Sequence, residues 1–317
     1  MDYNIFYKKK YLTIEDYNRN NVWDLFISGY NNSERVRKVF KKTNSLEKHW
    51  LIFPEYCYSM GECPKQDKCF TFSSGSTESE LIIDYASRSN SVLLNCNLCI
   101  DITGFMRPHL LFLIYYLYLN KVKKFDVIYT DPIKYCKHEE TTFTRSEVYD
   151  VRPILGFEGS PIPDNSNDLI IIGSGFDHQL IAHIAENKSN VRKKTQMFGF
   201  PSLQPDMFQQ NLLRAYKAEA SMEDKYSLDG QENLLAPAND PFVTASVIQE
   251  YVNTQKKITN LYLSPLSTKA QTLGFGIYYF WECINKPVSI IFPFCKQYER
   301  ETTEGISKIW KYTVELP

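Results

Sequence analysis

The most constraining feature of this 317-residue sequence is a pattern that occurs twice. An apolar run in the first half ends in Ser28-Gly29-Tyr30, and one in the second half ends in Gly173-Ser174-Gly175-Phe176. Ser174 follows Ser28 by 146 positions. Self-similarity over so long a period indicates repeated structural units. We therefore expect two copies of one unit, arranged with pseudo-two-fold symmetry around a shared cleft.

Three further features repeat in the same order. Phe53-Pro54 is matched by Phe200-Pro201 and Arg107 by Lys269, and the closing apolar runs reach Pro132 and Pro293. The offset between copies grows along the chain, which predicts an insert near residues 218–237 of the second copy. We expect a first half over 1–136, a linker or β excursion over 137–163, and a second half over 164–317.

Each half alternates short apolar runs with amphipathic or apolar segments of helical length. This alternation indicates a mostly parallel sheet covered by helices on both faces, an α/β Rossmann-like architecture. The first 20 residues carry no such pattern and are expected to be irregular. The expected strands cover 24–27, 50–53, 99–103, 125–129, 169–172, 196–198, 260–263 and 288–292.

Bulk properties exclude some functions. The formal net charge is −1, so a globally basic nucleic-acid-binding surface is not implied. No signal peptide is visible, and the most apolar run, 110–118, is shorter than the roughly 20 residues that span a bilayer. We expect a cytoplasmic protein without membrane contact.

Five cysteines could together hold a structural zinc ion. Their spacing matches no usual zinc ribbon, and one of them begins an expected buried strand, so we favour free thiols and no metal. No cofactor is implied. These candidates are Cys57, Cys63, Cys69, Cys96 and Cys99.

The first repeated motif lies where a strand gives way to a helix. Glycine there allows close approach of a ligand or of backbone, and helix N-termini bind anions; a simple tight turn is the alternative. The ligand-binding candidates of this motif are Ser28, Gly29, Tyr30 and Ser33 in the first copy and Ser174, Gly175, Phe176 and Asp177 in the second.

The second repeated motif places a hydroxyl and a cation before a helix. The first copy reads Asp101-x-Thr103-Gly104-x-x-Arg107, and the second reads Ser264-x-x-x-Thr268-Lys269. A hydroxyl and a cation at a helix N-terminus suit a phosphodiester. The alternative is a capped helix with a solvated base. We favour phosphate contact by Thr103, Arg107, Thr268 and Lys269.

Catalysis has three candidates. The stretch 73–81 resembles the Ser/Gly-rich turn before the glutamate of nucleoside deoxyribosyltransferase-like and TIR-like glycosidases, which would make Glu78 or Glu80 catalytic. A capping box beginning at Thr77 explains the same residues. His109 could serve as an acid or base, or pack as a polar residue at a helix start.

The segment Asp101–Leu111 resembles the D-x-T-H-G motif of CARF domains, although the histidine expected between Thr103 and Gly104 is missing. The second motif is similar to a degenerate CARF-like half, and two fused halves are similar in plan to SAVED domains. The resemblance implies sensing of a cyclic oligonucleotide in bacterial antiviral defence or stress signalling. Because no effector segment is visible, it also implies a protein partner or a homo-oligomer.

The sequence thus favours a nucleotide-binding protein. One alternative is a nucleotide-processing enzyme, either a glycosidase or a phosphodiesterase. Another is a non-catalytic subunit of a defence complex, with the Cys-rich loop Tyr56–Phe72 as its partner surface.

Overall fold

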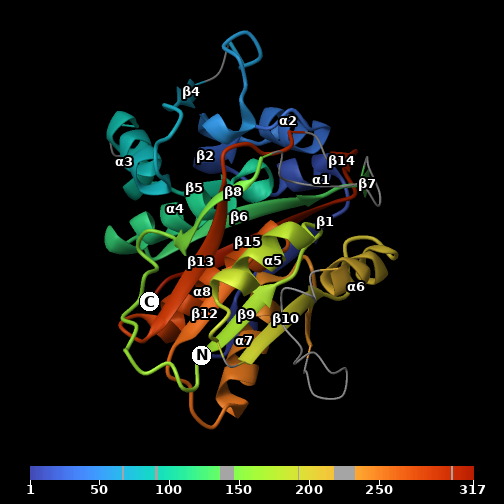
Figure 1. The fold of residues 1–317 in the computed structure, drawn as a ribbon. Coiled ribbons are helices and arrows are strands. Elements are labelled where there is room, and N and C mark those ends of the chain that lie inside the picture. The colour runs from blue at the N-terminus through green and yellow to red at the C-terminus, as the bar shows by residue number, and fades with distance from the viewer. Residues whose placement is uncertain (66–67, 90–91, 136–145, 192, 218–232, 301–302) are drawn as a thin grey trace. The chain divides into compact units, whose positions relative to one another are not determined.

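The computed structural model describes residues 1–65, 68–89, 92–135, 146–191, 193–217, 233–300 and 303–317 (Figure 1). The chain forms two compact units, each assembled from non-contiguous segments. The first unit comprises Ile5–Thr141 and Gln297–Pro317, and the second comprises Met1–Asn4 and Thr142–Lys296. Both units are α/β with mostly parallel sheets.

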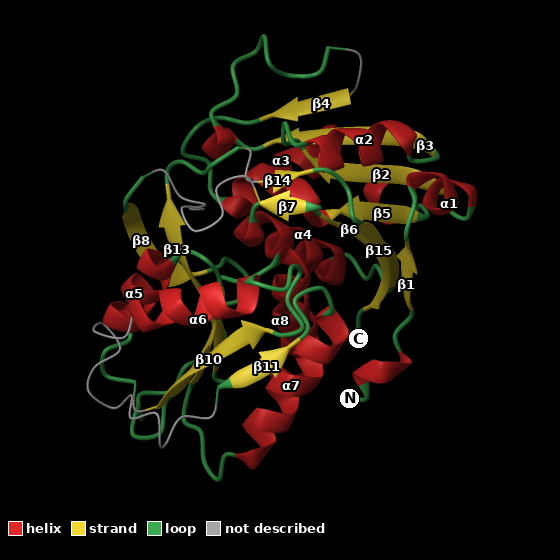
Figure 2. Cartoon of the chain, turned by 90° about the vertical axis from the view of Figure 1, so that its right-hand side faces the viewer, coloured by secondary structure: helices red, strands yellow, loops and turns green. Residues whose placement is uncertain are grey.

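The first unit contains a seven-stranded sheet of order β1-β15-β6-β5-β2-β3-β4. Figure 2 shows β3, β2, β5 and β6 side by side in this unit. The five strands from β4 to β6 pair in parallel, whereas β15 pairs antiparallel with both β6 and β1. Numbered in chain order, the parallel strands have the Rossmann order 3-2-1-4-5. The strands are β1 (Lys8–Tyr11), β2 (Trp23–Gly29), β3 (Ser45–Ile52), β4 (Lys68–Thr71), β5 (Leu98–Asp101), β6 (Lys124–Asp131) and β15 (Lys308–Glu315).

The second unit contains a six-stranded sheet of order β11-β10-β9-β12-β13-β8. Its five strands from β11 to β13 are parallel and again follow the order 3-2-1-4-5, with β8 antiparallel at the edge. The repeated sequence motifs therefore lie near the ends of strands that have the same places in the two strand orders. The strands are β8 (Val148–Pro153), β9 (Leu169–Gly173), β10 (Lys193–Gly199), β11 (Leu234–Ala236), β12 (Leu261–Pro265) and β13 (Val288–Cys295).

Helices connect the strands in both units. In the first unit α1 packs with α2 and α3 with α4, and in the second α5 packs with α6 and α7 with α8. None of the helices in the described part of the chain combines the length and apolar character needed to cross a membrane. The helices are α1 (Ile14–Arg19), α2 (Glu34–Lys42), α3 (Glu78–Arg88), α4 (Arg107–Leu119), α5 (His178–Asn187), α6 (Met207–Lys217), α7 (Pro241–Thr254) and α8 (Lys269–Tyr278).

An aromatic core fixes α1 and α2 on the sheet of the first unit. Phe40 of α2 stacks on Trp50 of β3 with ring centroids 3.6 Å apart, and Tyr17 of α1 packs 5.9 Å from Trp23 of β2. Tyr17 and Trp23 are at most 2% exposed. Burying aromatic side chains of this size supplies much of the hydrophobic stabilisation of such a layer.

Some sequence expectations are wrong at the ends of the chain and at element boundaries. The expected irregular start contains β1 and α1, and the C-terminal β15 was not expected at all. The strand expected to reach Thr103 stops at Asp101, because Ile102–Gly104 turns as a 3-10 helix, η4. After α8 the chain continues directly into a π-helical turn, η7 (Tyr279–Cys283).

The region between the halves is only partly described. Within the expected linker, β8 pairs with β13, which agrees with the expected β excursion, while 137–145 lie outside the described residues. Residues 218–232 of the expected insert also lie outside them. Two short strands, β7 (Lys134–Tyr135) and β14 (Thr303–Glu304), form a separate ribbon in the first unit.

Candidate functional site

In the first unit the two sequence motifs meet where the strand order reverses, between β2 and β5. The Ser28 hydroxyl donates to Asp101 Oδ2 at 3.1 Å, and Asp101 Oδ1 accepts from the Thr103 amide at 3.0 Å. Thr103 Oγ1 accepts from the Thr130 amide on β6 at 3.1 Å. Burial raises the pKa of the Asp101 carboxyl, an effect that the bonds from Thr103 and Ser28 oppose. This chain of bonds ties three strand ends together at the position where such folds bind ligands.

Two glycines make this junction possible. A Cβ atom on Gly104 would lie 1.9 Å from the carbonyl oxygen of Gly29, and one on Gly29 would lie 2.8 Å from the carbonyl carbon of Gly104. Neither position has room for a side chain, because backbone faces backbone. The close approach expected at these glycines is therefore between two turns of the same unit.

A buried arginine lies under the same strand ends. Arg35, in the first turn of α2, donates from Nη1 to the Thr130 carbonyl at 2.6 Å and is 9% exposed. Burial raises the pKa values of Tyr129 and Tyr135, and the positive charge of Arg35 partly offsets that rise. The candidate site therefore contains a cation that the motif analysis missed.

A carboxylate and an imidazole lie beside this junction. Glu55 follows β3, and its Oε1 is 3.5 Å from Nε2 of His109 in the first turn of α4. The imidazole is 3% exposed and packs 4.9 Å from the Phe53 ring. Tyr56, next in the chain, donates from its hydroxyl to the Gly104 carbonyl at 3.2 Å. This contact brings the segment after β3 against η4 of the second motif.

Four of these side chains carry buried polar atoms that have no hydrogen-bond partner among the described residues: Nε of Arg35, Oε2 of Glu55, both ring nitrogens of His109 and Oγ1 of Thr130. Buried polar groups are normally satisfied, and exceptions call for an explanation such as a ligand or water. All four lie around the carboxyl-end side of one parallel sheet. Their grouping is the strongest sign of a binding site in this unit.

Arg107 is the first residue of α4 and is partly exposed. Burial raises the pKa of Tyr56, and the positive charge of Arg107 partly offsets that rise. The same holds for Tyr135. Arg107 and Arg35 together give the strand ends positive charge.

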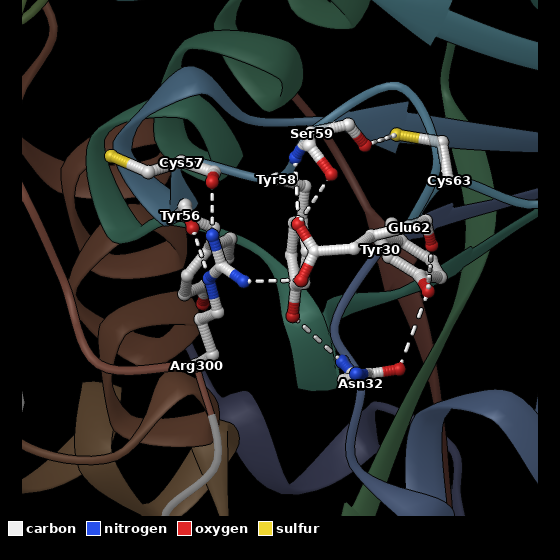
Figure 3. Close-up of polar contacts among 9 residues, drawn as sticks. All are labelled: Tyr30, Asn32, Tyr56, Cys57, Tyr58, Ser59, Glu62, Cys63 and Arg300. Atoms are coloured by element: carbon white, nitrogen blue, oxygen red, sulfur yellow. Dashed lines mark hydrogen bonds and ion pairs between the residues drawn. The ribbon is translucent and has the colours of Figure 1, made fainter.

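A loop over the end of β2 is held by one arginine (Figure 3). Arg300 donates from Nε to the Tyr56 carbonyl at 2.6 Å and from Nη2 to the Cys57 carbonyl, while Nη1 contacts Glu62 Oε1 at 2.8 Å. Its guanidinium also lies 4.4 Å from the centroid of the Tyr58 ring. One side chain therefore fixes much of the segment 56–62.

This loop encloses Tyr30. The Tyr30 hydroxyl donates to the Glu62 carbonyl at 2.9 Å (Figure 3). Its ring packs edge-on against those of Tyr58 and Trp50, with centroids 4.9 and 5.3 Å away. The residue is 4% exposed. Ser33 caps α2 by position without a side-chain bond. The Tyr30 ring therefore packs among neighbouring protein rings in this structure.

The first motif of the second unit occupies the equivalent strand end. Ser174 is fully buried and donates to Oε1 of Gln196 on β10. A Cβ on Gly175 would lie 2.4 Å from the Leu266 carbonyl oxygen, so the two motifs also meet here. Arg214 covers Phe176, with its guanidinium 4.9 Å from the ring and an Nη1 bond to the carbonyl. Asp177 stands at the start of α5 without a side-chain cap bond.

The second motif of this unit combines a cap with a buried hydroxyl. Thr268 caps α8 by accepting from the Gln271 amide at 3.1 Å, and its hydroxyl donates to the Ala238 carbonyl. Lys269 begins the helix and is partly exposed. Ser264 is fully buried, and its hydroxyl has no partner in the described part of the chain. The capped helix is therefore present, and it leaves one polar atom unexplained.

The glycosidase candidates Glu78 and Glu80 belong to the first turn of α3, where Glu80 bonds to Thr77. Thr77 and Glu80 form a complete capping box at the start of α3, with the Thr77 amide donating to Glu80 Oε2 at 2.8 Å. Glu78 is 2% exposed within the same turn. The capping interpretation of this stretch is confirmed.

The five candidate metal ligands are free thiols. Within the described ranges, no three His, Cys, Asp or Glu side chains gather in a way that could hold a metal ion. Cys63 and Cys69 instead donate to the carbonyls of Ser59 and Pro64, at 3.4 and 3.2 Å. Burial raises the pKa of Cys96 to about 11, which disfavours the thiolate that metals bind.

Fold and site define a Rossmann-like α/β protein with two similar sheets and polar clusters at the carboxyl ends of their strands. Comparison with family models, curated proteins and solved structures finds no match. The function must therefore be argued from the site itself.

Two site residues were missed by motif reasoning, yet each has a sequence signal. Arg35 is four positions before Val39, so it shares the apolar face of α2 with that residue. Glu55 directly follows an apolar strand. A charge on a core-facing helix position and an acid at a strand end are both recognisable once the strand order is known.

Proposed function

We propose that the protein binds a nucleotide at the carboxyl ends of its parallel strands, as expected of a sensor of cyclic oligonucleotides in bacterial defence or stress signalling. The observation that carries the proposal is the group of unpartnered buried polar atoms on Arg35, Glu55, His109 and Thr130. In an open α/β sheet this edge, at the reversal of strand order, is where ligands bind.

The chemistry of the group fits a phosphorylated ligand. Arg35 and Arg107 are permanently charged donors, and guanidinium groups pair with phosphate through two parallel bonds. Thr103 and the first turn of α4 add a hydroxyl and helix amides, which favour anions. Glu55 and His109 would then face the uncharged part of the molecule, because a carboxylate repels phosphate.

The second unit supports the same function through different residues. Lys269 and Thr268 start α8 beside the buried Ser264 hydroxyl. Each unit thus offers a hydroxyl and a cation at the fourth parallel strand. Cytoplasmic location and a protein partner or homo-oligomer are further parts of the proposal.

Isothermal titration with a panel of mono-, di- and cyclic oligonucleotides tests the proposal. Arg107→Ala and Lys269→Ala should each weaken binding by about 10-fold or more, as expected for loss of a charged contact. Lys286→Ala, a change of another lysine in the second unit, serves as a matched control and should leave the affinity unchanged. Unaltered binding in the Arg107/Lys269 double variant would reject the proposed sites.

A further inference from the structure

The two units differ in the residue that follows the second parallel strand of each sheet. Phe53-Pro54 follows β3 and Phe200-Pro201 follows β10, and both strands are second in chain order among the parallel strands of their sheets. Glu55 and Ser202 therefore hold the same place in the two units. Oε2 of Glu55 is buried without a partner among the described residues, whereas the Ser202 hydroxyl donates to the Gln204 carbonyl. An ionised carboxylate only accepts hydrogen bonds, so Glu55 needs a donor, while Ser202 already has its bond.

A second difference lies in the first turn of the helix that follows the fourth strand. His109 is the third residue of α4 and Gln271 is the third residue of α8, and both are at most 3% exposed. Neither ring nitrogen of His109 has a hydrogen-bond partner in the described ranges, although Nε2 lies 3.5 Å from Oε1 of Glu55. The Gln271 amide, by contrast, accepts from the Ser267 hydroxyl and donates to the Ala236 carbonyl at 3.1 Å. The second unit thus satisfies within itself a position that the first unit leaves open.

A third difference concerns the helix that follows the first parallel strand. Arg35 lies in the first turn of α2, and its Nε is buried without a partner among the described residues. The first turn of α5, residues 178–181, contains neither arginine nor lysine. In the second unit a buried strand-end atom without a described partner is the hydroxyl of Ser264, which carries no charge. Glu55 offsets one positive charge of the first unit, so the contrast between the units lies in unpaired polar groups and not in net charge.

These differences change what a ligand gains on binding. Leaving a buried polar group unsatisfied is costly, and a ligand that pairs with the group removes that cost. In the first unit a nucleotide can pair with atoms of Arg35, Glu55 and His109 that no described residue satisfies. In the second unit it must compete with the bonds that Gln271 and Ser202 already make. The same ligand should therefore bind the first unit more tightly.

We infer that the chain binds two nucleotides with unequal affinity, the tighter one at the strand ends of the first unit and the weaker one at those of the second. The inference rests on the proposed function, to which it adds the number of ligands and the order in which the units are filled. One additional hydrogen bond to a charged group corresponds to a difference in dissociation constant of about 10- to 100-fold. The first unit then responds at low ligand concentration, and the second responds only when the ligand is abundant.

Isothermal titration of the full chain with ATP, 3′,5′-linked cyclic di-adenylate and cyclic tri-adenylate tests the inference. For a probe that binds, the wild type should show two binding events whose dissociation constants differ by about 10- to 100-fold. Arg107→Ala should weaken only the tighter event and Lys269→Ala only the weaker one, each by about 10-fold or more. Lys286→Ala, at an exposed lysine outside both clusters, is the matched control and should change neither event. Unfolding midpoints in urea establish that the variants are folded.

The outcomes separate this inference from the proposed function. Two events of equal affinity, or a single event that both variants weaken, would overturn the inference while nucleotide binding stands. A single event that only Arg107→Ala weakens would likewise overturn it and leave nucleotide binding to the first unit alone. So would a difference in affinity that disappears at high salt, because salt screens exposed charges and affects buried hydrogen bonds much less. If no probe binds, both the inference and the proposed function are rejected.

Discussion

Replacing Gly104 with alanine should destabilise the first unit strongly. The new Cβ would lie 1.9 Å from the Gly29 carbonyl oxygen and 2.9 Å from its carbonyl carbon, whereas non-bonded heavy atoms pack at about 3.5 Å or more. A separation of about 1.5 Å must therefore open between two backbone segments. Overpacking costs about 1–3 kcal/mol, and we expect the upper end, about 3 kcal/mol, because no flexible side chain can yield.

Tryptophan fluorescence during urea unfolding can measure this loss. Three of the four tryptophans, Trp23, Trp50 and Trp310, belong to the first unit, so a Trp281→Phe background reports that unit alone. With a urea dependence of about 1–3 kcal/mol per molar, the midpoint should fall by about 1 M or more.

Gly61→Ala is the matched control for this experiment. No atom lies within 4 Å of the position its Cβ would take. The free energy of unfolding should therefore change by less than about 0.5 kcal/mol, and the urea midpoint should hardly move. If Gly104→Ala also changes the free energy of unfolding by less than about 0.5 kcal/mol, the close packing of the two turns at the candidate site is refuted.

Three further predictions follow from the same unit. Burial raises the pKa of Asp101 above its usual 3.8, so ionising this carboxyl destabilises the folded state. Asp101→Asn should therefore gain stability relative to the wild type as the pH rises from below 4 to 7. A difference in urea midpoints that does not depend on pH contradicts this. Arg300→Ala should speed alkylation of Cys63 about 10-fold or more by loosening 56–62, with Arg300→Lys intermediate, and equal rates in all three proteins oppose it. Glu80→Gln should preserve nucleotide binding and change the free energy of unfolding by less than about 0.5 kcal/mol, because glutamine also completes a capping box. Nucleotide turnover by the wild type that is lost in this variant would instead support the glycosidase.

The parallel strands were predictable because they are buried on both faces. Leu169–Gly173, for example, is fully buried and reads as an unbroken apolar run that periodic analysis recognises. The two antiparallel strands β1 and β15 lack this signal. Lys8–Tyr11 begins with three lysines, and its partner Lys308–Glu315 alternates polar and apolar residues nearly 300 positions later. Pairing over that distance follows from tertiary packing and not from local sequence.

The candidate site was predictable in part for a similar reason. Ser28 and Asp101 both end apolar strands, and parallel strands that neighbour each other bring such residues to one edge. The involvement of Arg35 and Glu55 depends on which strands are neighbours and on where α2 packs. Sequence periodicity does not specify strand order, so these two residues emerged only from the structure.

Native mass spectrometry of the purified protein, with the same nucleotides and cyclic oligonucleotides added, tests the central claim most directly. We expect a phosphorylated ligand, retained or acquired, that is lost in the Arg107→Ala/Lys269→Ala variant and released intact on denaturation. Protein that carries no ligand under any of these conditions would contradict nucleotide binding and favour the non-catalytic subunit. Release of a cleaved ligand would contradict a purely binding role and favour the enzyme.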